Sequence, residues 1–136
     1  MIVADTSALI AFFDSLDPAH DRVVPIVEAE RTPIAVSPLV CAEIDHLVTK
    51  RLGAHTARLV LAELASGAFD IAGFGIRELK GAAAVLDRYP DRRLGLTDAS
   101  LLDLADRLGT ATILTLDRRD FDGLVRTDGT PLVVLP

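Results

Sequence analysis

The sequence contains little cysteine and few aromatic residues. It has one Cys, one Tyr and no Trp among 136 residues. The single cysteine, Cys41, excludes an intramolecular disulfide, and no second Cys or His lies close enough in the sequence to suggest a zinc site. This usage is typical of a reducing compartment, so we expect a cytoplasmic protein. Because aromatic residues make up only 4% of the chain, base stacking can contribute little if the ligand is a nucleic acid.

Long apolar runs and an excess of positive charge are also missing. No apolar run approaches the roughly 18 to 20 residues of a membrane span, and the first run ends at Asp5, too early for a signal peptide. We therefore expect neither membrane insertion nor export. The chain carries 20 acidic and 14 basic side chains, a net charge of -6. This is the wrong sign for binding a polyanion by overall charge, so such a substrate would need a local reversal of the field.

Half of the residues are apolar, enough for one hydrophobic core at this length. Short apolar or β-branched runs predict strands, and apolar residues at steps of three and four predict helices between them. The predicted strands are 2–4, 34–36, 69–71, 112–116 and 131–135. One predicted helix begins after residue 7, and the others cover 18–30, 38–52, 54–65, 76–88 and 98–108. A turn is predicted at 117–120. Strands that are apolar throughout and alternate with helices indicate the α/β class, with a parallel sheet covered on both faces.

Three aspartates stand where such a fold binds ligands, beyond the carboxyl ends of the strands. Asp5 follows the first strand, Asp117 follows strand 112–116, and Asp98 opens a predicted helix after Thr97, its expected cap. Taken singly, each is more simply explained as a capping or turn residue. Their significance depends on whether they meet.

Glu43 is the fourth acidic residue of interest. In the helix 38–52 it lies among Val40, Ile44 and Leu47, which predicts a carboxylate within the core-facing stripe. Glutamate is rarely buried unless it is paired or binds a metal. No Lys or Arg lies three or four residues away, so His46 or a metal ion would be its partner.

Together, Asp5, Glu43, Asp98 and Asp117 can converge at the carboxyl edge of the sheet. Four ionised carboxylates at close range need cations to compensate their repulsion, and oxygen ligands suit Mg²⁺ or Mn²⁺. Such a site favours phosphoryl chemistry. Four basic residues flank these acids and would either contact phosphates or remain solvated loop charges: Arg92, Arg93, Arg118 and Arg119.

At these residues the sequence resembles the PIN-domain nucleases, in particular the VapC-type toxins of bacterial toxin-antitoxin pairs. The resemblance runs through the whole chain, in the family's order and approximate spacing. Four segments carry it: Ile2-Val3-Ala4-Asp5-Thr6-Ser7-Ala8-Leu9, Ala42-Glu43-Ile44, Leu96-Thr97-Asp98-Ala99 and Thr115-Leu116-Asp117-Arg118-Arg119-Asp120-Phe121.

The resemblance implies one PIN-like domain over residues 1–136, a three-layer α/β/α sandwich around a mainly parallel sheet of four or five strands. It implies a Mg²⁺-dependent endoribonuclease toxin that hydrolyses RNA, with Mn²⁺ as a substitute ion. It also implies a homodimer and neutralisation by a cognate antitoxin protein. The residues carried over as catalytic metal ligands are Asp5, Glu43, Asp98 and Asp117, with Asp120 as an additional acid that competes with Asp117 for the place closer to the metal. Thr6, Ser7 and Thr97 would either support these acids through their hydroxyl groups or serve simply as helix caps.

Two alternatives remain open at this point. A non-cleaving module that binds metal or RNA would share the fold, but its signature would be a missing carboxylate, and all four are present. A receiver-like phosphoacceptor domain also places Asp residues at strand ends. That class needs a lysine after its last core strands, whereas Lys50 and Lys80, the two lysines of the chain, fall in predicted helices.

Overall fold

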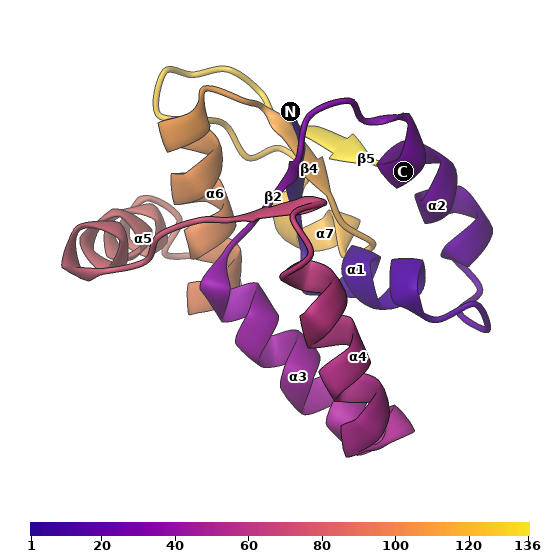
Figure 1. Cartoon of the computed structure of the whole chain (residues 1–136). Helices are drawn as coiled ribbons and strands as arrows, with labels where there is room; N and C mark the ends of the chain where they lie inside the picture. Colours follow the sequence, from indigo (N-terminus) through magenta and orange to yellow (C-terminus); the bar gives the residue numbers. More distant parts are fainter.

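Five short strands form one sheet in which every neighbouring pair is parallel. The structure is a computed structural model that describes residues 1–136 (Figure 1). The strands are β1 (Val3–Ala4), β2 (Ile34–Val36), β3 (Phe69–Ile71), β4 (Thr112–Leu114) and β5 (Val133–Leu135). The helices are α1 (Thr6–Phe13), α2 (His20–Ala29), α3 (Pro38–Leu52), α4 (Ala54–Leu64), α5 (Ile76–Arg88), α6 (Leu96–Leu108) and α7 (Arg118–Phe121). The predicted α/β class with a parallel sheet is confirmed.

The strand order β3-β2-β1-β4-β5 puts β1 at the centre. Val3 pairs with Ala35 of β2 on one side and with Ile113 of β4 on the other. The chain first builds outward from β1 to β3, and then returns through α5 and α6 to place β4 on the opposite side of β1. In such sheets the connections diverge where the strand order reverses, and a crevice forms beyond the carboxyl ends of those strands. The residues that follow β1 and β4 therefore face the position where a ligand is expected.

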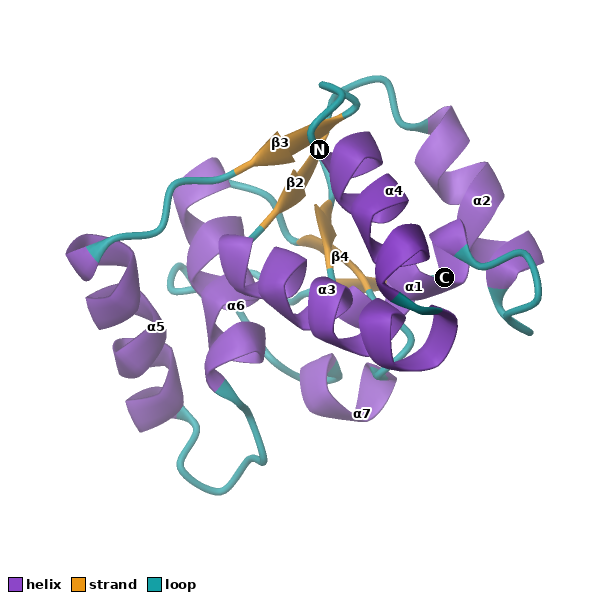
Figure 2. Ribbon diagram, turned by 60° about the horizontal axis from the view of Figure 1, so that its bottom comes forward, coloured by secondary structure: helices purple, strands orange, loops and turns teal.

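Helices cover both faces of the sheet. Helices α5 and α6 lie together on one side, and α1 and α2 lie on the other (Figure 2). Helices α3 and α4 form an antiparallel hairpin, in which Gly53 separates them at a φ of 91°, a conformation that L side chains rarely adopt. This arrangement confirms the three-layer α/β/α sandwich.

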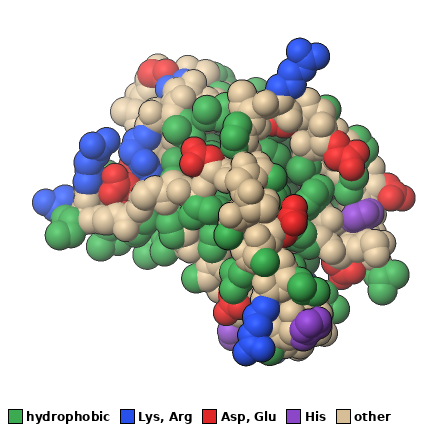
Figure 3. Space-filling model, in the orientation of Figure 1, with side chains coloured by type: hydrophobic (Ala, Val, Ile, Leu, Met, Phe, Trp, Pro, Cys, Tyr) green, Lys and Arg blue, Asp and Glu red, His purple; other side chains and the backbone are tan.

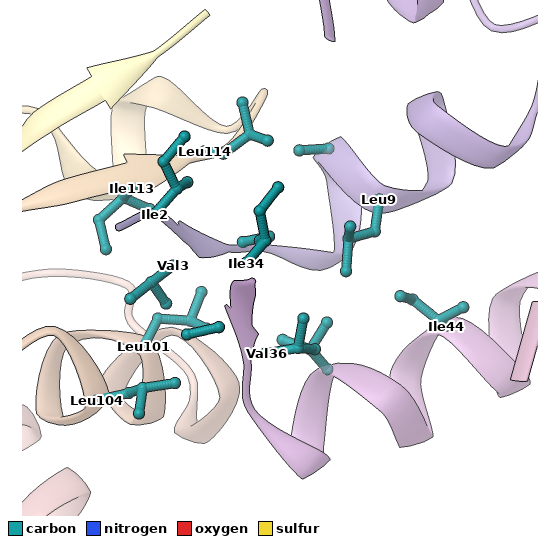
Figure 4. Packing of buried hydrophobic residues seen from close by; sticks show 14 of the residues in the cluster. Ile2, Val3, Leu9, Ile34, Val36, Ile44, Leu101, Leu104, Ile113 and Leu114 are labelled. Carbon is teal, nitrogen blue, oxygen red and sulfur yellow. The ribbon is translucent and has the colours of Figure 1, made fainter. Parts of the chain in front are cut away.

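A single cluster of 30 buried apolar residues fills the space between the layers. Leu101 and Leu104 of α6 pack towards Val3 on one side of the sheet, and Leu9 of α1 and Ile44 of α3 lie on the other (Figure 4). Burying a side chain of this size stabilises the fold by about 1.5–3 kcal/mol. The packed core thus fixes the strand ends that carry the polar residues described below.

Some predicted boundaries were wrong. The strand predicted at 112–116 ends at Leu114, and the strand predicted at 131–135 begins at Val133. Helix α6 begins at Leu96, with Gly95 rather than Thr97 at its cap position, because the Asp98 carboxylate reaches back and accepts a hydrogen bond from the Gly95 N–H at 2.8 Å. The predicted turn at 117–120 is one turn of helix, α7, closed by a 2.7 Å bond from the Asp122 N–H to the Arg118 carbonyl. None of the helices has the length and apolar character needed to cross a bilayer.

Candidate active site

A pocket of about 360 Å³ opens beyond the carboxyl ends of β1 and β4. Five of its eleven lining residues are acidic. Asp5 follows β1, Asp17 lies in the α1–α2 connection, and Glu43 belongs to α3. Asp98 belongs to α6, and Asp117 follows β4. The four acidic residues singled out in the sequence therefore share one pocket, although they lie up to 112 residues apart in the printed sequence.

Asp5 is the deepest of these acids, with 4% of its surface exposed. Its Oδ2 accepts hydrogen bonds from the hydroxyls of Ser7 at 2.8 Å and Thr115 at 2.7 Å. Oδ1 receives no donor from the protein. One edge of the carboxylate is thus fixed by hydroxyl groups, and the other is available to a ligand in the pocket.

Glu43 reaches the pocket from α3, but not as the sequence predicted. Its side chain is exposed rather than part of the buried stripe, which consists of Val40, Ile44 and Val48. The partner of Glu43 is neither His46 nor another charged side chain: the Thr6 hydroxyl donates to its Oε2 at 2.6 Å. Because Thr6 is the first residue of α1, this bond connects the start of α1 to α3 across the pocket.

Asp98 lies in the first turn of α6, half-buried at the pocket wall. Burial raises the pKa of its carboxyl to about 6, and the negative charges of Asp5, Asp120 and Glu43 act in the same direction, against the hydrogen bond from Gly95. Thr97 beside it makes no side-chain hydrogen bond to any of the acids; its carbonyl oxygen accepts from Ser100 at 2.7 Å. Thr97 is therefore neither the helix cap nor a hydrogen-bonding partner of these carboxylates in this structure.

Asp117 precedes α7 and lines the pocket. Partial burial raises the pKa of its carboxyl, and the charges of Asp5 and Asp120 add to this effect. Its backbone N–H donates to the Thr115 hydroxyl at 3.0 Å. Asp120, on α7, lines a neighbouring pocket with Asp117 instead of the main one.

None of Asp5, Glu43, Asp98 and Asp117 forms a salt bridge. The raised pKa values of Asp98 and Asp117 have the same origin, because uncompensated negative charge and partial burial both disfavour ionisation. Perturbed carboxyl groups in a cleft are typical of functional sites. No set of three His, Cys, Asp or Glu side chains forms a closed ligand cluster, however. The pocket therefore attracts cations without enclosing one in protein ligands alone.

The four arginines expected around the pocket divide into two groups. Arg92 donates to the carbonyls of Arg119 at 3.2 Å and Asp122 at 2.7 Å, and Arg118 donates to the Pro136 carbonyl at 2.8 Å. These two guanidinium groups therefore hold the backbone around α7. Arg93 and Arg119 are exposed and have no side-chain partner, and Arg119 lines the smaller pocket with Asp120.

Sequence reasoning missed three residues of this site. Thr115 supports Asp5, while Asp17 and Arg51 line the pocket. The sequence could have indicated Thr115, because it lies near the carboxyl end of a predicted strand, two residues before Asp117. Arg51 stands eight residues after Glu43 in the same helix, with Leu47 midway, and residues at this spacing belong to one broad stripe of a helix.

A second pocket, of about 340 Å³, opens at the amino ends of β2 and β3 and lacks these features. Its lining includes Phe12, Phe69 and Glu30. The Glu30 carboxylate accepts a hydrogen bond from the Thr32 hydroxyl at 2.7 Å and forms an ion pair with the amino terminus at 3.7 Å. The pocket at the carboxyl edge is therefore the candidate active site.

The sequence matches the family model described as PIN domain over residues 2–126. The chain belongs to the PIN-domain family. Among its PIN-domain relatives is Ribonuclease VapC26 of Mycobacterium tuberculosis (strain ATCC 25618 / H37Rv), with 43% identity over 135 residues that cover 99% of this chain and 100% of that protein. This match places the chain with the VapC proteins of the family.

Solved structures of PIN-domain proteins share the fold. The crystal structure of VapC20 of Mycobacterium tuberculosis, described as a Sarcin-Ricin loop cleaving toxin, superposes with a TM-score of 0.80 at 20% identity, over 86% of this chain and 90% of that one. A toxin-antitoxin complex from Klebsiella pneumoniae gives a TM-score of 0.69 at 22% identity, over 91% of this chain and 92% of that one. At such identities the likeness concerns the PIN fold alone.

Proposed function

We propose that this protein is a metal-dependent endoribonuclease that hydrolyses RNA phosphodiesters at the pocket of Asp5, Glu43, Asp98 and Asp117, and that it acts as the toxin of a toxin-antitoxin pair. The main observation behind the proposal is that these four carboxylates line one pocket with no salt bridge to any of them. The name ribonuclease carried by the 43% identical VapC26 supports RNA as the substrate.

The donor set fits a hard divalent cation. Apart from Arg51, the polar side chains of the pocket offer carboxylate and hydroxyl oxygens, with neither His nor Cys among them. Oδ1 of Asp5 is the acceptor best placed to bind an ion, because Oδ2 is already occupied by Ser7 and Thr115. Since no closed cluster of three ligands exists, one or two carboxylates would bind the ion directly and the others through water. This is the usual manner of Mg²⁺, which we propose as the cofactor, with Mn²⁺ as a substitute.

A bound divalent ion supplies a water of lowered pKa and offsets negative charge on the phosphate. The side chains of the chain prepare the site for it. Ser7 and Thr115 hold Asp5 in one orientation, and Thr6 does the same for Glu43. The Asp98 carboxyl, with a pKa of about 6, holds a proton over a wider pH range than an ordinary aspartate does. A cation that binds near Asp98 therefore competes with that proton.

Cleavage of end-labelled RNA by the purified protein tests the proposal. We expect cleavage with Mg²⁺ or Mn²⁺, loss of cleavage with a chelator, and recovery when the metal is restored. Asp5→Asn and Asp98→Asn should each lower the rate by more than about 100-fold, because changes to groups that only support metal ligands already cost about 10–100-fold. Asp45→Asn is the matched control, since Asp45 is an exposed acid on α3 that does not line the pocket. Full activity of either site variant, or cleavage that persists in chelator, would contradict the proposal.

We also propose an antitoxin partner and a homodimer. The Klebsiella pneumoniae neighbour is a toxin-antitoxin complex, and this chain exposes large apolar side chains such as Leu16 and Ile76, at 89% and 77% of their surface. Light scattering should give twice the mass of one chain for the isolated protein. Co-expression with the candidate antitoxin should give a stable complex with reduced cleavage of RNA. A monomer in solution, or a complex with undiminished activity, would contradict the respective proposal.

A further inference from the structure

Arg51 is the one basic side chain among the residues that line the acidic pocket. It lies in the last turn of α3, is exposed, and forms no salt bridge. This contrasts with Arg92 and Arg118, whose guanidinium groups are bonded to backbone carbonyls around α7. Arg51 therefore keeps its hydrogen-bond donors free beside the site.

The position of Arg51 along α3 places it away from the acidic end of the pocket. Glu43, Leu47 and Arg51 recur at intervals of four residues, and all three line the pocket. At the rise of an α-helix, eight residues correspond to about 12 Å along the axis. Leu47 lies between Glu43 and Arg51 along α3 and is apolar, and Ile10 is a further apolar residue of the pocket lining. A strand of RNA bound with one phosphate at the carboxylates would therefore have another part of its backbone near Arg51.

A positive charge at the position of Arg51 would offset the repulsion between the acidic pocket and a polyanion. Five acidic side chains and one arginine line the pocket, so an approaching polyanion is repelled over most of the surface. Asp17 is the acid on the α1–α2 connection, and its Oδ1 accepts a 2.8 Å bond from the Ala19 N–H instead of pairing with Arg51. An arginine side chain is well suited to a phosphate, because its planar group can donate two parallel hydrogen bonds. In Figure 3 the tip of the α3–α4 hairpin, where α3 ends, shows Lys or Arg atoms beside histidine and acidic side chains.

We propose that Arg51 binds a phosphate of the RNA strand other than the one that is cleaved, while the intervening nucleotide lies against Ile10 and Leu47. Arg51 is then a positioning residue: it sets the register of the strand and takes no part in bond breaking. This inference rests on the proposed ribonuclease function and adds the way in which the substrate is held.

Kinetics of Arg51→Gln provide the test, with Arg51→Lys as the conservative variant. The matched control is Lys50→Gln, which removes the neighbouring cation of α3 that does not line the pocket. We expect Arg51→Gln to raise KM about 10-fold with kcat changed by less than about 2-fold, Arg51→Lys to fall between, and Lys50→Gln to match the wild type. Loss of one phosphate contact should also lower the slope of log K against log salt by about 0.7 for a single strand.

Shortened substrates give a second readout. Oligonucleotides trimmed from either end should become insensitive to Arg51→Gln once they lack the phosphate that Arg51 contacts. Binding of a fluorescent RNA in chelator, where no cleavage is expected, should show the same ranking of variants as KM. An unchanged thermal midpoint would show that the exposed substitution leaves the fold intact.

The outcomes separate this inference from the function on which it rests. A wild-type protein that neither cuts nor binds RNA would overturn both. If the wild type cuts RNA and Arg51→Gln leaves KM and the salt slope unchanged, or lowers kcat at constant KM, only the role of Arg51 is wrong. An effect of Arg51→Gln confined to the antitoxin complex would assign the guanidinium to the protein partner and likewise overturn the inference.

Discussion

Thr115 donates a 2.7 Å hydrogen bond to Oδ2 of Asp5, although 110 residues separate the two. The same Thr115 hydroxyl accepts a hydrogen bond from the Asp117 N–H at 3.0 Å. Ser7 completes the connection, because its hydroxyl donates to Asp5 and accepts from the Leu116 N–H at 2.9 Å. Two hydroxyl groups thus join the segments that follow β1 and β4, and they hold the deepest acid of the pocket in place.

Replacement of Thr115 by valine should weaken both the fold and the site. The change keeps the shape of the side chain but leaves the Asp5 carboxylate with one donor fewer and the Asp117 N–H without an acceptor. We expect the free energy of unfolding to fall by about 1–3 kcal/mol and RNA cleavage to fall about 10-fold. Urea denaturation and cleavage assays measure these effects. Thr112→Val, in β4 just before Thr115, is the control, and equal stability of the two variants would contradict the role of Thr115.

The raised pKa of Asp98 predicts how stability depends on pH when no metal is present. The pKa is about 6 in the folded protein and near 3.8 in the unfolded chain, so the folded state binds more protons between these values. Stability should therefore fall as the pH rises from about 4 to about 6 and stay low above that range. The shift would correspond to about 3 kcal/mol for a fully buried group, which solvent screening reduces to about 1 kcal/mol here.

Asp98→Asn isolates this contribution. Because the variant has no ionisable group at this position, its loss of stability between about pH 4 and 6 should be smaller than that of the wild type by about 1 kcal/mol. In chelator at neutral pH, the variant should therefore be more stable than the wild type. Urea denaturation at a series of pH values provides the measurement. Parallel pH profiles for the wild type and Asp98→Asn would show that Asp98 titrates normally.

Divalent cations should stabilise the folded protein through the acidic pocket. A ligand that binds only the folded state at 100 times its Kd adds about 2.7 kcal/mol, which thermal denaturation with and without Mg²⁺ detects. The gain should disappear in Asp5→Asn and persist in Asp45→Asn. A monovalent salt of equal ionic strength controls for general screening. Equal thermal shifts in both variants would place the ion elsewhere on this acidic protein.

We expect Arg92 to stabilise the fold, whereas its neighbour Arg93 should not contribute to stability. Its guanidinium group donates to the carbonyls of Arg119 and Asp122, which attach α7 to the segment before α6. We expect Arg92→Gln to lower the free energy of unfolding by about 1 kcal/mol, the order of a single net hydrogen bond, and Arg93→Gln to leave it unchanged. Denaturant titration of the two variants measures the difference. A stable Arg92→Gln that binds RNA less tightly would restore the interpretation of Arg92 as a phosphate contact.

Some elements were predictable to the residue. Helix α3 begins and ends as expected, because Ser37 accepts from the Leu39 N–H at 3.3 Å, Pro38 occupies the first turn and Gly53 ends the helix. Helix α5 likewise matches its expected bounds. These capping signals involve only a few neighbouring residues, so the helix ends that they set do not depend on the tertiary structure.

Other features escaped prediction because they depend on distant partners. The periodicity of α3 predicted a buried Glu43, yet the residue lies at the exposed edge of the helix, where Thr6 reaches it. Thr97 looked like the cap of α6, but the Asp98 side chain turned back to Gly95 and moved the start of the helix. Both errors came from interpreting a residue within its own segment.

The sequence by itself determined the class of the fold, the limits of α3 and α5 and the four acids worth examining, because capping, apolar periodicity and strand-end position are local properties of a chain. Only the tertiary structure decided that β1 lies between β2 and β4, that Thr115 holds Asp5, and that Arg51 rather than Arg92 lines the pocket. Strand order and side-chain contacts are set by which surfaces bury each other across the whole chain. No short stretch of sequence contains that information.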